Sequence, residues 1–160
     1  MGNWSSKQTV PCLDLNRYQG TWIEVAKFTE GDLVPNFKTI FYKTNLDGKS
    51  MEVTETTEDT LSIKGNIIQI NDCYPGRLFI SFPIQSGKIY TLYDRNIGNY
   101  WVLYTDYDNY AIVSTPDEKC LWILSRKESN TYQSINNLKY ILLKRGYVLD
   151  KLIINTKTFI

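Results

Sequence analysis

The stretch LDLNRYQGTWIEVAKF, residues 13–28, carries most of the information about the fold. It places Gly20 two residues before Trp22 and then continues as a run of β-forming residues with an inward–outward alternation, a pattern typical of a half-buried strand. Similar short runs recur along the chain, separated by turn residues such as Asp47 and Gly48. The predicted strands cover residues 21–28, 38–46, 51–57, 62–70, 77–82, 89–93, 100–106, 110–114 and 121–125.

Short connections between neighbouring strands favour antiparallel hairpins, and a long meander removes its exposed edges by closing into a barrel. We therefore expect an all-β fold, with a β-sandwich as the alternative that the spacing also allows. After Ser129 the apolar residues change to helical spacing, Ser129 or Asn130 can cap the helix, and Gly146 ends it. One amphipathic helix packed outside the sheet is predicted there, followed by a short strand over residues 152–155.

Composition excludes several classes of function. The chain has 160 residues and no histidine, which removes the commonest general base and the commonest metal ligand. Its 18 basic and 17 acidic residues give a net charge of +1, without the basic surface that nucleic-acid binding requires. We expect no nucleic-acid partner, no metal and no cofactor.

The length is that of one domain, and we expect an arm over residues 1–11 followed by a single domain over residues 12–160. The start matches M-G-x-x-x-[ST], so Gly2 is a candidate for N-myristoylation, with an ordinary flexible arm as the alternative. No signal peptide or membrane span is visible in the sequence. This predicts a cytoplasmic protein or one held at a membrane by an acyl chain, and a secreted one if the chain is a processed form.

Three motifs in order resemble those of the lipocalin family. LDLNRYQGTWIEVAKF looks like the family's G-x-W opening, YWVLYTDYDNYAIV (residues 100–113) is similar to the T-D-Y motif, and LWILSR (residues 121–126) resembles the closing strand. The sequences of these three segments are most similar to those of the branch that contains apolipoprotein D and the bacterial lipocalins. The motif residues are Gly20, Trp22, Thr105, Asp106, Tyr107 and Arg126.

The resemblance implies an eight-stranded antiparallel up-and-down barrel, called a calyx, with one C-terminal helix packed outside and a short final strand. It also implies that Trp22 closes one end of the barrel and that Arg126 lies across the indole ring. Trp22, Arg126 and the Thr105–Tyr107 turn then identify the fold and stabilise it. A ligand would bind elsewhere, on the inner wall.

Strand alternation, with its phase fixed by Trp22, predicts that inner wall. On the first strand Ala26 also points inward, whereas Ile23 and Val25 point outward beneath the helix. Cys120 is inward when counted back from Arg126. The candidate calyx residues are Glu24, Phe28, Tyr42, Tyr100, Val102, Tyr104, Trp122 and Leu124.

Such a lining is aromatic and mostly apolar, which suits a fatty acid, lysolipid, sterol or retinoid-like molecule. A barrel filled by its own side chains is the alternative. Glu24 is the exception. A carboxylate on an apolar wall must be paired or protonated, or else the predicted inward–outward alternation is locally wrong. The stretch 83–99 departs from the family pattern, so we make no prediction of its strand phase.

We expect a binding or transport protein for a small hydrophobic ligand, not an enzyme. Two alternatives stay open: a lipocalin-type isomerase with a calyx cysteine as nucleophile, and an interaction protein that uses its loops. The isomerase is less favoured because no histidine can activate the thiol of Cys120. Peripheral membrane association follows if Gly2 is acylated, and the sequence makes no prediction of the oligomeric state.

The chain has three cysteines, Cys12, Cys73 and Cys120, so at most one internal disulfide can form. In the apolipoprotein D branch an N-terminal cysteine is joined to the hairpin before the closing strand. The resemblance therefore implies a Cys12–Cys120 bridge that leaves Cys73 single. A reducing compartment would instead keep all three thiols free.

Overall fold

The computed structural model describes residues 8–30, 36–83, 96–127 and 130–159. Four predictions lie wholly or mainly outside these ranges. They concern acylation of Gly2, most of the N-terminal arm, the strand over residues 89–93 and capping by Ser129.

The strands match the sequence pattern closely because each is a short β-forming run bounded by turn residues. A single helical turn, α1 (Leu15–Tyr18), precedes the first strand. The strands are β1 (Gly20–Phe28), β2 (Thr39–Thr44), β3 (Ser50–Thr56), β4 (Ser62–Gln69), β5 (Arg77–Ser81), β6 (Tyr100–Thr105), β7 (Tyr110–Ser114), β8 (Leu121–Ser125) and β9 (Ile153–Ile154).

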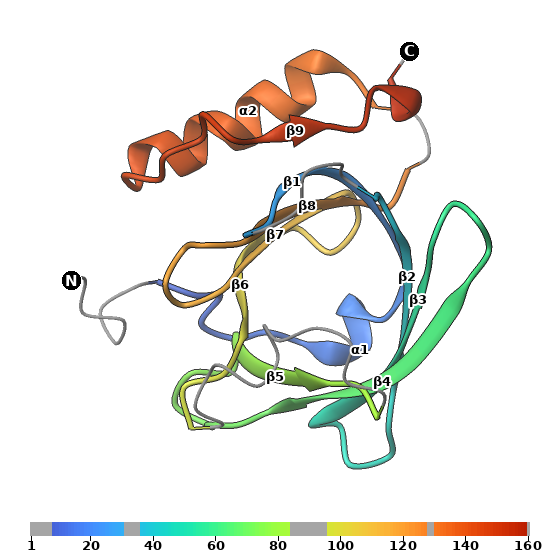
Figure 1. Ribbon diagram of the computed structural model, residues 1–160. Coiled ribbons are helices and arrows are strands. Elements are labelled where there is room, and N and C mark those ends of the chain that lie inside the picture. Colours follow the sequence, from blue (N-terminus) through green and yellow to red (C-terminus); the bar gives the residue numbers. More distant parts are fainter. Residues whose placement is uncertain (1–7, 31–35, 84–95, 128–129, 160) are drawn as a thin grey trace.

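Strands β1 to β8 form a closed barrel, seen end-on in Figure 1. Each of β2 to β7 pairs antiparallel with the next strand along the chain, and β1 closes the ring by pairing with both β2 and β8. The eight-stranded up-and-down barrel is confirmed. β9 pairs with the far end of β1, where Ala26 lies opposite Ile154.

Helix α2 (Tyr132–Lys144) packs outside the barrel against the side formed by β1, β7 and β8 (Figure 1). Its N-cap is Thr131, whose hydroxyl accepts a hydrogen bond from the Ser134 N–H at 3.1 Å. The prediction of Asn130 as the cap is wrong. Asn130 is buried, and its Oδ1 accepts hydrogen bonds from Tyr110 and Ser125, so its side chain holds the helix entry against the barrel.

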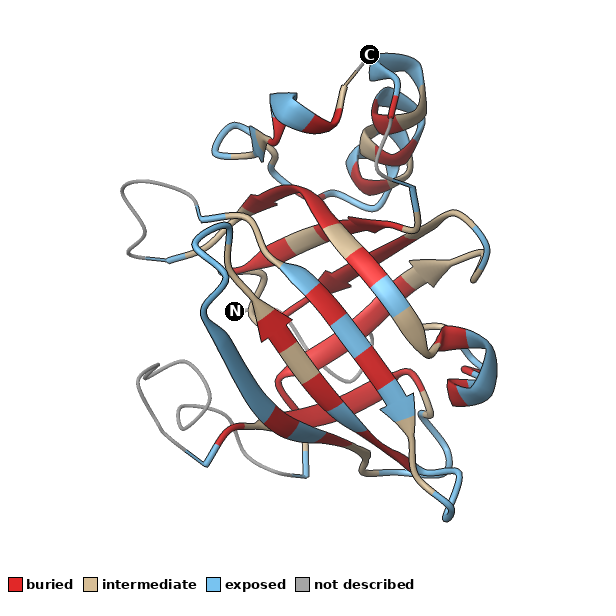
Figure 2. Cartoon of the chain, turned by 90° about the vertical axis from the view of Figure 1, so that its right-hand side faces the viewer, coloured by how far each residue is buried: buried red, intermediate tan, exposed pale blue. Residues whose placement is uncertain are grey.

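Two hydrophobic cores share the barrel wall. One fills the interior around Trp22, Tyr42 and Val102, and the other lies between the wall and α2 around Ile123, Ile135 and Leu142. Figure 2 shows buried and exposed residues alternating along the strands that face solvent on their outer side. A strand beneath α2 is instead buried on both faces.

Candidate ligand site inside the barrel

One end of the barrel is closed by Trp22 and α1. The Trp22 side chain is fully buried and donates its indole N–H to the backbone oxygen of Tyr18 at 2.8 Å. On the other side of the ring, the guanidinium carbon of Arg126 lies 3.8 Å from the ring centroid. Arg126 therefore lies across Trp22, as the resemblance implies.

The Arg126 guanidinium also ties three chain segments together at this end. It donates to the backbone oxygens of Arg17, Tyr18 and Thr21, all at 3.0–3.1 Å. Its Nε donates to the Tyr107 oxygen at 2.9 Å. The planar guanidinium can meet several carbonyls at once while stacking on the indole, which an ammonium group could not do.

The T-D-Y motif builds the tight turn between β6 and β7. Asp106 Oδ1 accepts the N–H groups of Asn109 and Tyr110 at 2.8 and 2.9 Å. Burial raises the pKa of Asp106, but these hydrogen bonds outweigh it and leave the pKa below its usual value. Tyr107, at φ 65°, accepts the Asp14 N–H on its hydroxyl at 3.0 Å. The motif thus holds the segment before α1 against the barrel.

Six of the eight candidate calyx residues lie on the inner wall. Tyr42, Tyr100, Val102 and Leu124 belong to the interior core, and Trp122 packs against it. Glu24 is also inside, because it is buried, lies two residues after Trp22 before the bulge and is directly opposite the interior residue Leu124. These observations place the side chains, whereas their contact with a ligand stays a prediction.

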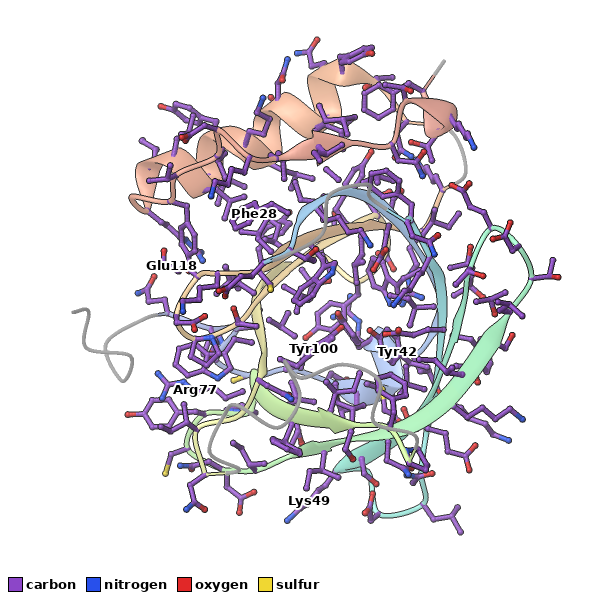
Figure 3. The ribbon with its side chains drawn as sticks, viewed as in Figure 1. Phe28, Tyr42, Lys49, Arg77, Tyr100 and Glu118 are labelled. Carbon is purple, nitrogen blue, oxygen red and sulfur yellow. The ribbon has the colours of Figure 1, made fainter. Side chains whose placement is uncertain are left out.

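Phe28 and Tyr104 are on the other face of the wall, so the phase predicted for them is wrong. Glu24 pairs with Leu124 and Ala26 with Ile123, which makes Val25 an extra residue in β1. Such a β-bulge shifts the alternation by one position. As a result Ala26 joins the outer core instead of the interior, and Phe28 packs against that core beneath α2 (Figure 3).

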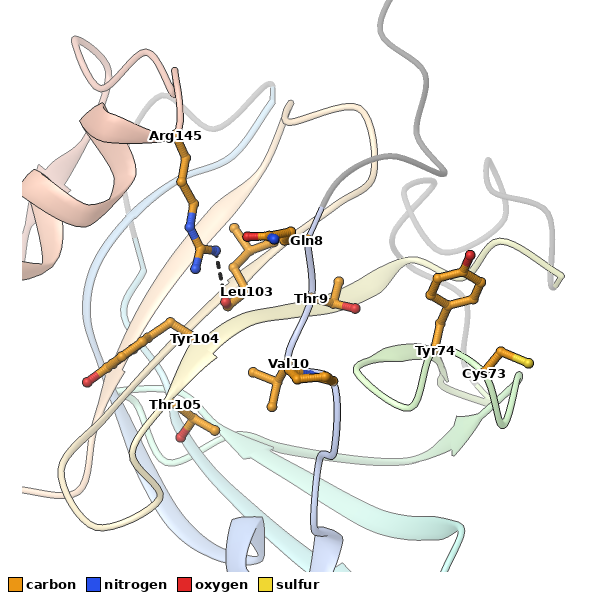
Figure 4. Close-up of a pocket in the computed structure, with 10 residues that line it drawn as sticks. Gln8, Thr9, Val10, Cys73, Tyr74, Leu103, Tyr104, Thr105 and Arg145 are labelled. Carbon is orange, nitrogen blue, oxygen red and sulfur yellow. Dashed lines mark hydrogen bonds between the residues drawn. The ribbon is translucent and has the colours of Figure 1, made fainter.

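A second bulge explains Tyr104. Val102 pairs with Val113 and Tyr104 with Ile112, so Leu103 is the extra residue in β6. Tyr104 therefore faces out and lines an external groove of about 590 Å³, shown in Figure 4. Arg145 crosses from the end of α2 into this groove and donates to the Leu103 oxygen at 2.9 Å.

The first bulge also turns Lys27 inward, which the sequence pattern did not predict. Its ammonium group lies 3.0 Å from Glu24 Oε1, and both side chains are about 5% exposed. Lys27 also donates to the Asn36 oxygen, and Glu24 accepts the Lys38 N–H at 2.8 Å. Glu24 is therefore an inward carboxylate that is paired. The same contacts hold β1 to the segment that leads into β2.

A second ion pair lies beside the first. Lys38 Nζ is 3.1 Å from Glu55 Oε1, and the Glu55 side chain is 9% exposed. Burial raises the pKa of Glu24, with a smaller rise from Glu55, while Lys27 opposes the rise. The interior is therefore more polar at this level than predicted. Glu55 was recognisable from its alternation with the inward residues Met51 and Val53, whereas Lys27 gave no signal.

Nearer the closed end, three tyrosine hydroxyls meet inside the barrel. The Tyr100 hydroxyl lies 2.7 Å from that of Tyr18 and 2.7 Å from that of Tyr42. Tyr18 was not predicted as part of the lining, because it precedes the first strand and reaches the interior from α1.

All three cysteines are free thiols. Cys12 and Cys73 are exposed, and Cys120 is buried directly before β8. The Cys12–Cys120 bridge implied by the resemblance is absent from the structure. The Cys120 backbone instead pairs with Thr115, whose Oγ1 accepts the Cys120 N–H at 3.1 Å.

Two further observations concern the described ranges alone. No three His, Cys, Asp or Glu side chains there gather closely enough to hold a metal ion. None of the helices in those ranges is long and apolar enough to cross a membrane.

A closed antiparallel barrel with an external helix, and with one end closed by an arginine stacked on a tryptophan, defines a calyx-type β-barrel protein. Residues 13–157 match the lipocalin-like domain family, and the chain belongs to this family. Mouse apolipoprotein D is 26% identical over 95% of this chain and 81% of its own length. Temperature-induced lipocalin-1 of Arabidopsis thaliana is 27% identical over 91% of the chain and 80% of its own length.

Solved structures show the same fold. Insecticyanin from the tobacco hornworm Manduca sexta superposes with a TM-score of 0.66 at 24% identity, covering 94% of this chain and 84% of its own. The amine-binding protein of Rhodnius prolixus, solved as its tryptamine complex, gives a TM-score of 0.56 at 14% identity, with coverage of 94% and 85%.

Proposed function

We propose that this protein binds a small hydrophobic molecule inside its barrel and stores or transports it. The observation that carries the proposal is the inner wall itself, which places aromatic and aliphatic side chains above a closed end. Burial of apolar ligand surface would supply the affinity, and the few polar groups would set the orientation. Relatives support the general idea, since the amine-binding protein was solved with tryptamine bound.

The two ion pairs refine the class of ligand. Glu24, Lys27, Lys38 and Glu55 form a charged level between the tyrosine hydroxyls and the chain's return to β2. A ligand that reaches this level meets charged groups, so a polar group there is favoured over a bare hydrocarbon end. We therefore favour an amphipathic ligand such as a fatty acid, lysolipid, sterol or retinoid-like molecule.

Binding is favoured over catalysis. The isomerase alternative requires a reactive thiolate, and Cys120 is buried in a chain that contains no histidine to activate it. Peripheral membrane association and a role for the loops stay predictions from the sequence.

Tryptophan fluorescence tests the proposal. Trp122 packs against the interior core, whereas Trp101 belongs to the outer core, so the two report different compartments. We expect retinol, oleate or lysophosphatidylcholine to change the emission of the wild type and of Trp101→Phe. In Trp122→Phe the change should be smaller, with Trp22 as the interior tryptophan that still reports binding.

Extraction of the protein purified from its host, followed by mass spectrometry, would identify the bound molecule. If none of the three probes changes the emission and the extract holds no small molecule, the barrel is filled by its own side chains and the proposal is wrong.

A further inference from the structure

The three interior tyrosines form a chain of hydroxyls buried in the barrel. Tyr18 and Tyr42 are 0% and 1% exposed, and Tyr100, at the centre of the chain, keeps 7%. Figure 3 shows Tyr42 and Tyr100 pointing toward each other inside the ring of strands. Tyr100 is therefore the least buried of the three.

Counting protons shows that this chain of hydroxyls has a surplus donor. Each phenol carries one O–H proton and can also accept hydrogen bonds. Three protons are available, the two mutual contacts use two of them, and no other described residue bonds to these hydroxyls. Within the described residues, one O–H group therefore has no acceptor, and a buried donor that is not satisfied costs free energy.

The trio is also neutral, and two of its members, Tyr42 and Tyr100, lie near a negative charge. Burial raises the pKa of all three tyrosines well above the usual value, so they remain O–H donors. The Glu55 carboxylate raises the pKa of Tyr42 and Tyr100 further, so its charge is felt at these hydroxyls. A second anion placed beside them would be disfavoured by the same charge.

We propose that the end of the ligand nearest Trp22 carries a neutral carbonyl oxygen, of a ketone or an aldehyde, and that the Tyr18–Tyr42–Tyr100 trio donates its surplus O–H to it. A carbonyl accepts and does not donate, so it matches a surplus of one donor, whereas a ligand hydroxyl would bring a further proton. This inference rests on the proposed function and specifies which chemical group the ligand carries at the deepest point of the barrel.

Three probes of equal chain length test the inference: 2-undecanone, undecane and undecanoate, each titrated by displacement of a fluorescent reporter. The comparison of interest is the ratio of the ketone to the hydrocarbon dissociation constant, because both probes bury the same chain. One hydrogen bond contributes roughly a threefold to tenfold change in this ratio. The carboxylate should bind more weakly than the ketone.

The variants follow from the proton count. Tyr18→Phe or Tyr42→Phe removes one proton and one contact, so each leaves one surplus donor and should keep the preference for the ketone. The triple variant Tyr18→Phe/Tyr42→Phe/Tyr100→Phe removes every donor and should lose the preference by roughly threefold to tenfold. The three phenylalanine rings of this variant still fill the space of the tyrosine rings. Replacing all the hydrogen-bonding hydroxyls together is far less destabilising than leaving one buried hydroxyl without its partner. Tyr132→Phe, on the exposed face of α2, is the matched control.

Infrared spectroscopy gives a second readout that needs no variant. The ¹³C-labelled carbonyl of 2-undecanone should absorb at lower frequency in the wild-type protein than in cyclohexane. An unshifted frequency, or a triple variant that keeps the full preference, overturns the inference. If undecane binds and the ketone binds no better than in the triple variant, the inference fails while the proposed function stands. If no probe binds, the proposed function fails as well.

Discussion

Arg126 combines two tasks that a shorter or more flexible cation would separate. Its face stacks on Trp22, and its N–H groups satisfy backbone oxygens of the turn between α1 and β1 and of the β6–β7 turn. All of these contacts lie at the closed end and are made to the indole ring or to backbone oxygens. We therefore expect the residue to stabilise the barrel rather than to bind a ligand.

Arg126→Ala is expected to lower the free energy of unfolding by about 2 kcal/mol or more, because it removes the cation–π contact and leaves several carbonyls without a donor. Arg126→Lys should recover part of the loss, since an ammonium keeps the charge without the planar geometry. Chemical denaturation measures the stability, and probe titration measures the affinity. An unchanged unfolding midpoint with a large loss of affinity would contradict this assignment.

The Glu24–Lys27 pair shows why a buried charge must be judged with its partner. Each side chain is nearly inaccessible to water, so each depends on the other for compensation. Lys27→Met should destabilise the protein by about 3 kcal/mol, because it leaves the buried Glu24 carboxylate without its compensating charge. The double variant Glu24→Gln/Lys27→Met should recover much of that loss. A double-mutant cycle from urea denaturation checks this, and a double variant no more stable than Lys27→Met would refute it.

The same carboxyl predicts a pH dependence. Burial raises the pKa of Glu24 in the folded protein above its unfolded value, so the folded state holds this proton more tightly than the unfolded chain does. The stability that this group contributes therefore falls as the pH rises through the interval above the ordinary carboxyl pKa. As the pH rises above the ordinary carboxyl pKa, the wild type should lose stability relative to the Glu24→Gln/Lys27→Met variant. Urea denaturation at several pH values measures this difference, which stays constant if the prediction is wrong.

Among the strands, β1 and β6 show what alternation can and cannot predict. Trp22, Tyr42, Tyr100 and Val102 were placed correctly because each lies on a regular stretch next to a recognisable motif. Phe28 and Tyr104 were misplaced because a single extra residue reverses the phase of everything beyond it. Nothing in the local composition of β1 or β6 marks the bulge, since the positions involved are ordinary apolar residues. The register against the neighbouring strand is what reveals it.

Helix α2 is capped by Thr131, directly after the two caps predicted from the sequence, Ser129 and Asn130. Thr131→Ala should lower the free energy of unfolding by about 1 kcal/mol, because the Ser134 N–H loses its acceptor. Thr131→Ser keeps a hydroxyl in the same place and should behave as the wild type. Thermal unfolding followed by circular dichroism compares the three proteins. Equal stability of the alanine and serine variants would show that the cap contributes nothing.

For the whole molecule, local patterns in the chain predicted the all-β fold and the external helix, whereas the eight-stranded barrel and its closed end followed from the resemblance to the lipocalin motifs. The polar groups inside the barrel were harder to predict. Tyr18 enters the interior from a helical turn, and Lys27 enters it after a bulge, so both depend on how distant segments are placed in space.

The state of the cysteines is a property of the whole molecule that solution chemistry can check. In the native protein we expect a thiol reagent such as Ellman's to modify the two exposed residues, Cys12 and Cys73, quickly and the buried Cys120 slowly or not at all. After unfolding without reductant, all three should react. Peptide mapping under non-reducing conditions should find no linked pair. A Cys12–Cys120 peptide in that map would show that the bridge implied by the resemblance forms in solution.

Closure of the barrel through β1 also has a consequence for how the chain reaches this structure. Ile23, in the first strand, pairs with Ser125, in the last strand of the ring. Until β8 has been synthesised and released from the ribosome, one edge of β1 stays open, and β9 cannot complete the outer layer. Folding dominated by such distant strand pairings is slow compared with that of helical proteins. The nascent chain therefore exposes an unpaired strand edge for most of its synthesis, the state in which β-rich proteins are most prone to aggregate.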